Sequence, residues 1–96
     1  MVERQLIIKG RLGLHARAAA KLVRLTTSFQ SQVMLRRLDG DVTADAKSIL
    51  SVLMLAANQG TELHASADGV DEEVAMNAIE ELFSTGFGEP EPESSI

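Results

Sequence analysis

The sequence has no cysteine, tryptophan or tyrosine, and only three phenylalanines and two prolines among its 96 residues. The lack of cysteine excludes disulfides, thiolate metal ligands and a cysteine nucleophile. With no tyrosine or tryptophan to stack on bases and a net charge of −5, the chain does not suit nucleic acid, which we do not expect as a partner. No glycine-rich nucleotide loop and no metal-ligand spacing is found, so we expect neither a metal nor a cofactor.

Long hydrophobic runs are missing as well. The longest nearly apolar stretch, residues 49–57, is interrupted by Ser51 and is too short to span a bilayer. No basic segment followed by an apolar signal core is found at the N-terminus. We therefore expect a cytoplasmic, monomeric protein without membrane insertion. Its length and 45% hydrophobic content allow one domain with a modest core.

The charges that are present are divided unequally along the chain. Residues 1–38 hold eight Lys or Arg and one acid, a net charge of +7, whereas residues 39–96 hold one Lys and thirteen acids, a net charge of −12. In the basic part, Arg17, Lys21 and Arg24 recur at helical spacing and predict a charged stripe on one helix face. Such a stripe is commonly just a solvated face; here we expect a docking surface for acidic partners.

Hydrophobic periodicity predicts a βαββαβα order of elements. Strands are expected at 2–9, 33–38, 42–44 and through Leu63, Ala65 and Ala67, and helices at 16–29, at 48–57 and from 72 onward. Three helices with apolar faces and a small sheet imply an α/β (α+β) two-layer open-faced sandwich, with the helices on one side. The folded domain is expected over 1–87, followed by an acidic, disordered tail over 88–96 that alternates glutamate with proline.

Finer details of these elements also follow from residue type. Asp39-Gly40 suits the positive φ angles of a tight hairpin turn, and Asp71 suits a helix N-cap. Gly86 suits a left-handed helix end from which Phe87 folds back onto Leu82. The expected inner faces are Ala16, Ala19, Ala20, Val23, Leu22, Leu25 and Phe29 on the first helix and Ala75, Ala78, Ile79 and Leu82 on the last.

The most informative motif is Gly13-Leu14-His15-Ala16-Arg17, which lies between the first strand and the first helix. His15 falls at the helix N-cap, where backbone N–H groups without intrahelical partners point towards the imidazole. Arg17 adds a fixed charge and a fork of donors suited to phosphate oxygens. A histidine at such a place also serves as a plain cap or a half-buried core residue. Together, however, these residues predict a site that holds a phosphoryl group.

This motif resembles the signature of the HPr family, the histidine-containing phosphocarriers of the bacterial phosphotransferase system. A second block, Ala46-Lys47-Ser48-Ile49 through Asn58-Gln59-Gly60, resembles the family's regulatory-serine helix and the turn after it. The resemblance implies an antiparallel sheet in the order 1-4-2-3. It also implies that Nδ1 of His15 accepts phosphate from enzyme I, fed by phosphoenolpyruvate, and passes it to an enzyme IIA-type component. Such a protein is a carrier rather than an independent enzyme.

The resemblance also marks residues around the relay histidine. It implies that a serine kinase or phosphorylase acts on Ser48 in some bacteria, although a helix cap is the alternative reading of that serine. The expected docking surface comprises Ala16, Lys21, Arg24, Ile49, Leu50 and Leu53, for which ordinary solvation or core packing is the alternative. Ala18 stands where the family usually has proline, at a cost in stability of about 0.4 to 1 kcal/mol.

Two functional classes remain open from the sequence. One is a phosphocarrier relaying through His15. The other is a regulatory binding module that signals by its phosphorylation state without feeding sugar transport. The sugar and nitrogen branches of the family are not separated by these motifs. His64, expected on the outward side of the last strand, is interpreted as structural.

Overall fold

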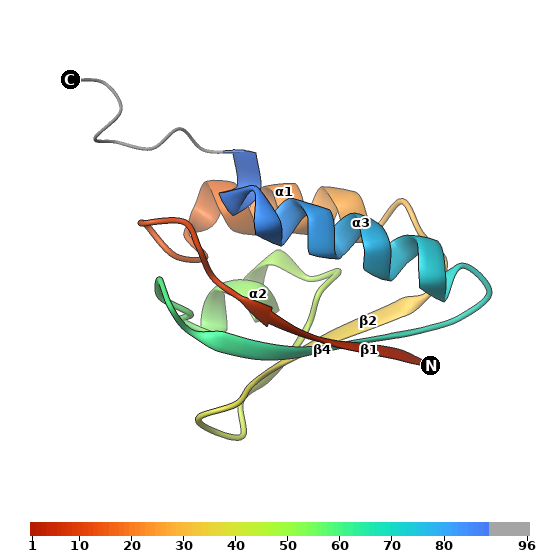
Figure 1. The fold of residues 1–96 in the computed structure, drawn as a ribbon, viewed down its shortest axis with the longest axis horizontal. Coiled ribbons are helices and arrows are strands. Elements are labelled where there is room, and N and C mark those ends of the chain that lie inside the picture. Colours follow the sequence, from red (N-terminus) through yellow and green to blue (C-terminus); the bar gives the residue numbers. More distant parts are fainter. Residues whose placement is uncertain (89–96) are drawn as a thin grey trace.

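The computed structural model describes residues 1–88, and the tail predicted over 88–96 therefore lies, apart from Gly88, outside the described residues. The elements follow the predicted βαββαβα order, with one short 3₁₀ turn added (Figure 1). They are β1 (Val2–Ile7), α1 (Ala16–Thr26), β2 (Gln32–Arg37), β3 (Thr43–Asp45), α2 (Ile49–Met54), β4 (Glu62–Asp68), α3 (Glu72–Ser84) and η1 (Gly86–Gly88).

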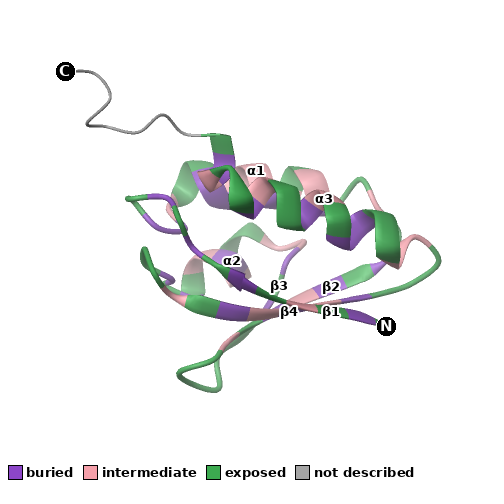
Figure 2. Cartoon of the chain, viewed as in Figure 1, coloured by how far each residue is buried: buried purple, intermediate pink, exposed green. Residues whose placement is uncertain are grey.

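The four strands form one antiparallel sheet in the order β1-β4-β2-β3, which confirms the predicted fold and strand order. Leu63, Ala65 and Ala67 of β4 alternate inward as predicted and are fully buried. The helices cover this inner face, while the opposite face is open to solvent (Figure 2). The core thus lies between one sheet face and the helices.

Helix α1 is shorter than predicted, and its buried face is rotated. The helix ends at Thr26, because the amides of Ser28 and Phe29 turn back to carbonyls three residues earlier. Ala16 is exposed rather than buried, and the buried residues are Ala18, Ala19, Leu22 and Thr26. Alanines lie on both sides of this helix and carry little periodic signal. The prediction also missed that Thr26 is buried with its hydroxyl donating to the Ala46 carbonyl at 2.6 Å.

Helix α3 shows a similar partial agreement. Ala75 and Ile79 are buried as predicted, but Met76 and Phe83 complete the buried face, and Ala78 and Leu82 are only half-buried. Gly86 has the expected positive φ of 63°. Phe87 is buried, and its ring contacts that of Phe83, a partner the prediction did not name, with 4.9 Å between the ring centroids.

Two predictions about turns are wrong: the backbone conformation of the β2–β3 hairpin and the end of helix α2. Neither Asp39 nor Gly40 has a positive φ. The hairpin closes instead through a wider loop, in which the guanidinium of Arg37 donates to both carboxylate oxygens of Asp39 at 2.8 and 2.9 Å. Helix α2 ends at Met54 instead of reaching residue 57, and Ala56 takes a positive φ of 52°. This early ending frees the next residues to contact the loop before α1.

Asp71 occupies the predicted N-cap position of α3, but its side chain makes no capping hydrogen bond. The carboxylate instead accepts from the backbone N–H groups of Gln30 and Ser31 at 2.8 and 2.9 Å and from the Ser31 hydroxyl. It therefore ties the segment after α1 to the start of α3. The Ser31 hydroxyl first, and the Gln30 amide next, lower the pKa of Asp71 below its ordinary value.

The loop between β1 and α1 is held by the segment that precedes β4. The Leu14 amide donates to the Ala57 carbonyl at 2.9 Å, and the Gly60 amide donates to the Ile8 carbonyl at 2.8 Å. Gly13 has a φ of +68°, and a Cβ added there would lie 2.6 Å from the Ala57 oxygen. Only glycine fits this approach, which sets the path of the chain into His15.

We predict that Asp71→Asn destabilises the fold at neutral pH and that this difference shrinks in acid. A carboxyl whose pKa is lowered by folding stabilises fully above its unfolded value, about 3.9, and loses that contribution as the pH falls through the lower folded value. Thermal melts from pH 7 to pH 2.5 measure the gap, with Asp41→Asn, on the exposed hairpin, as the control. A gap that is the same at every pH would contradict the assignment.

We predict that Gly13→Ala destabilises the fold more than Gly60→Ala. Both residues have a positive φ, which costs roughly 1–2 kcal/mol for alanine, but a Cβ at Gly60 meets nothing within 4 Å. The clash with the Ala57 oxygen should add about 1–3 kcal/mol at Gly13 alone. Urea denaturation of both variants measures the difference. Equal destabilisation would show that the loop moves away at no cost.

Candidate functional site

His15 is the N-cap of α1, as the sequence predicts. Its backbone is extended, with φ −77° and ψ −179°, and its carbonyl accepts the Ala19 amide at 2.8 Å to begin the helix. Its Nδ1 accepts the backbone N–H of Arg17 at 3.3 Å. A ring nitrogen that accepts a hydrogen bond carries no proton, so in the neutral ring the proton lies on Nε2. The lone pair of Nδ1 therefore points at the first turn of the helix.

The first turn of α1 brings further positive potential to this nitrogen. The amides of Ala16, Arg17 and Ala18 have no acceptor within the helix, and the helix dipole is positive at this end. The Arg17 side chain is exposed, and no described carboxylate forms an ion pair with it. Ala18 is fully buried and supplies an amide that a proline would lack. The arrangement suits a group with negative oxygens bound at Nδ1.

Helix α2 presents an apolar surface to solvent. Ile49, Leu50 and Met54 have exposed fractions of 43%, 67% and 69%, and we call these three residues the apolar patch. Core packing, the alternative reading, is therefore wrong for Ile49 and Leu50. Leu53 is half-buried and packs against the core, so it serves the interior as well. The prediction missed Met54, although its helical spacing of four residues from Leu50 signals it.

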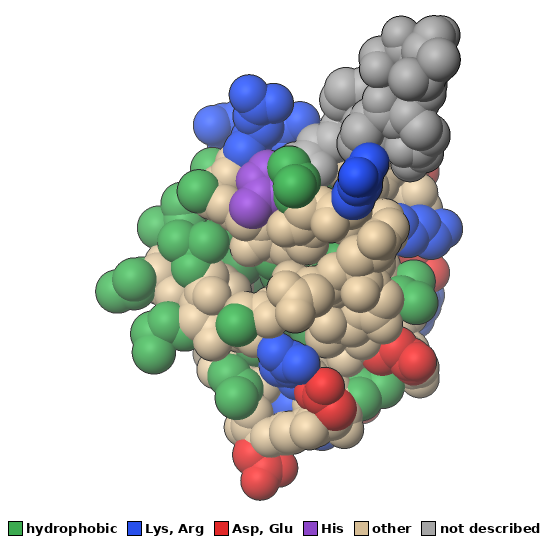
Figure 3. Space-filling model, turned by 90° about the vertical axis from the view of Figure 1, so that its left-hand side faces the viewer, with side chains coloured by type: hydrophobic (Ala, Val, Ile, Leu, Met, Phe, Trp, Pro, Cys, Tyr) green, Lys and Arg blue, Asp and Glu red, His purple; other side chains and the backbone are tan. Residues whose placement is uncertain are grey.

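The end of the molecule that carries the start of α1 and helix α2 is shown in Figure 3. The histidine in this view has hydrophobic side chains on both sides, with the larger group to its left, and lysine or arginine side chains lie above it and to its right. Exposed apolar side chains grouped in this way mark interaction surfaces more often than chance. The face thus combines a nucleophilic nitrogen, cationic side chains and an apolar contact area.

Ser48 is the N-cap of α2, and its Oγ accepts the Ser51 amide at 3.3 Å. This geometry confirms the capping role. It leaves the regulatory role a prediction. The neighbouring Lys47 donates from Nζ to the Phe29 carbonyl at 2.8 Å and so links the start of α2 to the segment after α1.

The basic stripe consists of Arg17, Lys21 and Arg24, and its members differ in the structure. Arg17 and Arg24 are exposed. Lys21 is half-buried, and its Nζ donates to the Phe87 carbonyl at 2.7 Å. Lys21 therefore also holds the end of the described chain against α1. The sequence pattern does not signal this contact, because the two residues lie 66 positions apart.

The second histidine lies elsewhere. His64 is on the open face of the sheet, where its Nε2 is 2.7 Å from Oε1 of Glu3 on the neighbouring strand β1. Cross-strand pairs of this kind stabilise sheets. The outward orientation agrees with the structural interpretation, and Glu3 is a partner that the prediction did not find.

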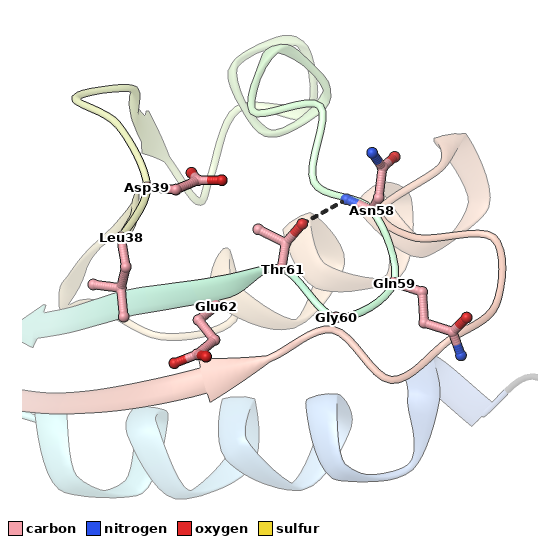
Figure 4. A pocket seen from close by; sticks show the side chains of 7 residues that line it. All are labelled: Leu38, Asp39, Asn58, Gln59, Gly60, Thr61 and Glu62. Atoms are coloured by element: carbon pink, nitrogen blue, oxygen red, sulfur yellow. Dashed lines mark hydrogen bonds between the residues drawn. The ribbon is translucent and has the colours of Figure 1, made fainter.

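A shallow, mainly polar hollow lies between the hairpin and the turn before β4 (Figure 4). It is lined by Leu38, Asp39 and residues 58–62, and the backbone N–H of Asn58 donates to Oγ1 of Thr61 at 3.0 Å. None of the predicted site residues lines it. Among the described residues there is no group of three His, Asp or Glu side chains that could hold a metal ion. None of the described helices is both long and apolar enough to cross a membrane.

Comparison with known proteins identifies the family. The family model PTS-HPr, described as the phosphorylation site of the HPr component of the phosphotransferase system, matches residues 2–85. A phosphocarrier protein HPr of Xylella fastidiosa is 48% identical over 89 residues, which cover 93% of this chain and 98% of that protein. A phosphocarrier protein NPr of Proteus mirabilis is also 48% identical, over 90% of this chain and 94% of that protein.

The solved structures agree with this assignment. A crystal structure of HPr from Thermoanaerobacter tengcongensis superposes with a TM-score of 0.87 at 37% identity, over 95% of this chain and all of that one. The His15 motif, the confirmed strand order and these matches all lead to one conclusion. The chain belongs to the HPr family of phosphocarrier proteins of the phosphotransferase system.

Proposed function

We propose that this chain accepts a phosphoryl group from enzyme I on Nδ1 of His15 and passes it to an enzyme IIA-type protein. The observation that carries the proposal is the position of Nδ1, which caps α1 and accepts the Arg17 amide at 3.3 Å. In the transfer, the lone pair of Nδ1 forms the new N–P bond as the N–P bond of the donor phosphohistidine breaks. The Arg17 N–H, released from Nδ1, then donates to a phosphoryl oxygen.

The protein has little covalent chemistry to perform in this step. In-line transfer requires an aligned nucleophile and compensation of the charge on the equatorial oxygens. The extended His15 backbone and the fixed loop before it supply the alignment. The amides of the first turn and the exposed Arg17 guanidinium supply the compensation. A phosphoimidazole retains a high transfer potential, so the group passes onward as easily as it arrives.

Docking of both partners is proposed at the surface around His15. The apolar patch of Ile49, Leu50 and Met54 supplies contact area, and Arg17 and Arg24 attract acidic groups. Ala16, also exposed, allows close approach at the rim of the site. Both enzyme I and the IIA-type acceptor use this one surface, so we propose that they bind in turn to a monomeric, cytoplasmic carrier.

A regulatory module that signals by its phosphorylation state is the alternative, and it uses the same His15 chemistry. Relatives named HPr and NPr match at the same 48% identity, so these comparisons favour neither the sugar nor the nitrogen branch. A IIA-type protein that accepts phosphate from this chain and feeds a sugar permease would favour the carrier function. Phosphorylation-dependent binding without onward transfer would favour the alternative.

We predict that His15→Ala abolishes the acid-labile phosphate label formed with enzyme I and phosphoenolpyruvate. His64→Ala is the matched control, because His64 lies on the open sheet face beside Glu3 and should label as the unmodified protein does. Thermal melts of both variants establish that they fold. A label that survives in His15→Ala, or disappears in His64→Ala, would overturn the site assignment.

We predict that Ser48→Asp weakens binding to enzyme I about tenfold, which corresponds to about 1.4 kcal/mol. The added charge lies next to the apolar patch and faces the acidic groups that the basic stripe attracts. Aspartate still caps the helix, whereas Ser48→Ala removes the cap at a cost of about 1 kcal/mol of stability and adds no charge, so it separates the effect of capping from that of charge. Titration calorimetry at two salt concentrations measures all three proteins. Equal affinities would reduce Ser48 to its capping role.

A further inference from the structure

The guanidinium of Arg37, the last residue of β2, links the hairpin to the end of helix α2. On one side, its Nε and Nη2 donate to the two carboxylate oxygens of Asp39 at 2.8 and 2.9 Å. On the other side, its Nη1 donates to the carbonyls of Leu55 and Ala56 at 2.9 and 3.1 Å. Figure 4 shows the Asp39 carboxylate extending from the hairpin towards the segment that joins α2 to Asn58. One half-buried side chain thus connects two loops.

The charges of Arg37 and Asp39 keep this link closed at neutral pH. The hydrogen bond from Arg37 holds the pKa of Asp39 below its ordinary value, and the same bond raises the pKa of Arg37. Both groups are therefore ionised, and hydrogen bonds from a charged donor are stronger than those between neutral groups. The guanidinium is planar and rigid, so the two bonds to Asp39 also orient Nη1 towards the carbonyls at the end of α2.

Arg37 binds the backbone at a strained residue. Ala56 has a φ of 52°, in the left-handed region that residues other than glycine rarely adopt. Helices often end in this conformation, but glycine usually occupies the position. The Leu55 carbonyl belongs to the peptide before the Ala56 Cα, and the Ala56 carbonyl belongs to the peptide after it. Arg37 thus holds both peptide planes that define this conformation, and strained residues persist only where their surroundings fix them.

The chain after Ala56 leads directly to the contact that supports His15. The Ala57 carbonyl accepts the Leu14 amide at 2.9 Å, and a Cβ added to Gly13 would lie 2.6 Å from the same oxygen. Rotation of the backbone at Ala56 would swing this carbonyl away from its donor. The residue that follows Leu14 is the N-cap of α1, so its position depends on that contact.

We propose that Arg37 is a positioning residue for phosphoryl transfer, which holds Ala56 in its left-handed conformation and so places the Ala57 carbonyl under the loop before His15. Asp39 orients the guanidinium for this task. The kinetic part of this role rests on the proposed function, in which His15 accepts phosphate. A small displacement of the nucleophile lowers the rate of transfer more than it lowers the affinity of docking.

Single-turnover kinetics test the consequence for transfer. In Arg37→Gln, we expect the maximal rate of phosphate uptake from phosphorylated enzyme I to fall about tenfold. The half-saturating concentration of enzyme I should change by less than about twofold. Arg36→Gln is the matched control, because it removes the same charge from the next residue, which is exposed and pairs with His64 on the open sheet face. Unchanged maximal rates, or equal losses in both variants, would refute the positioning role.

NMR of the unphosphorylated proteins tests the positioning without reference to transfer. We expect the amide protons of Leu14 and Arg17 and the ring nitrogens of His15 to shift in Arg37→Gln and to stay in place in Arg36→Gln. Unmoved signals in a folded Arg37→Gln protein would contradict the proposal. If none of the proteins accepts phosphate, the proposed function fails, while these shifts still decide whether Arg37 positions His15.

A second substitution separates the proposed role from general stabilisation. Glycine adopts a positive φ without strain, so in Ala56→Gly the backbone no longer needs Arg37 to hold it. We expect the loss caused by Arg37→Gln to shrink from about tenfold to about threefold when it is measured in the Ala56→Gly protein. A loss of the same size in both backgrounds would disprove the link through Ala56. Should Arg37→Gln not fold, Arg37→Lys, which keeps the charge without the planar fork, replaces it with the same expected outcomes.

Discussion

The hydrogen bond from the Arg17 amide to Nδ1 of His15 is the interaction on which the site depends. It holds the ring against the helix end, with Nδ1 directed at the first turn of α1. The loop before His15 sets the geometry of this hydrogen bond. In that loop Gly13 passes close to the Ala57 carbonyl, and the Leu14 amide donates to the same oxygen. The contact of this loop with the Ala57 carbonyl thus positions His15 and the first turn of α1.

Helix α2 shows how the fold divides its apolar residues between stability and binding. Val52 and Leu55 are buried and attach the helix to the core, while Ile49, Leu50 and Met54 remain in water. Leaving a large side chain exposed forgoes about 1.5–3 kcal/mol of the stabilisation that burial provides. That free energy becomes available when a partner covers the patch. The apolar patch lies at the same end of the molecule as His15, and this position is the physical basis of the proposed docking surface.

Much of this architecture could be predicted from the sequence because its signals are local. The alternation of Leu63, Ala65 and Ala67, the cap positions of His15 and Ser48, and the order of elements all follow from spacing and residue type. The errors arose where distant contacts decide the outcome. Asp71 binds Gln30 and Ser31 in place of its own helix, and Thr26 is buried with its hydroxyl donating to the Ala46 carbonyl. The buried face of α1 was also predicted wrongly, because small alanine side chains lie on both sides of this helix and carry little periodic signal.

The central claim, that Nδ1 of His15 carries the phosphoryl group at the helix N-terminus, is tested most directly by NMR of the phosphorylated protein with ¹⁵N-labelled histidine. We expect a ³¹P–¹⁵N coupling to Nδ1 of His15 and a shift of the Arg17 amide proton as its acceptor changes from the ring nitrogen to a phosphoryl oxygen. A coupling to Nε2, or to either ring nitrogen of His64, would contradict the account.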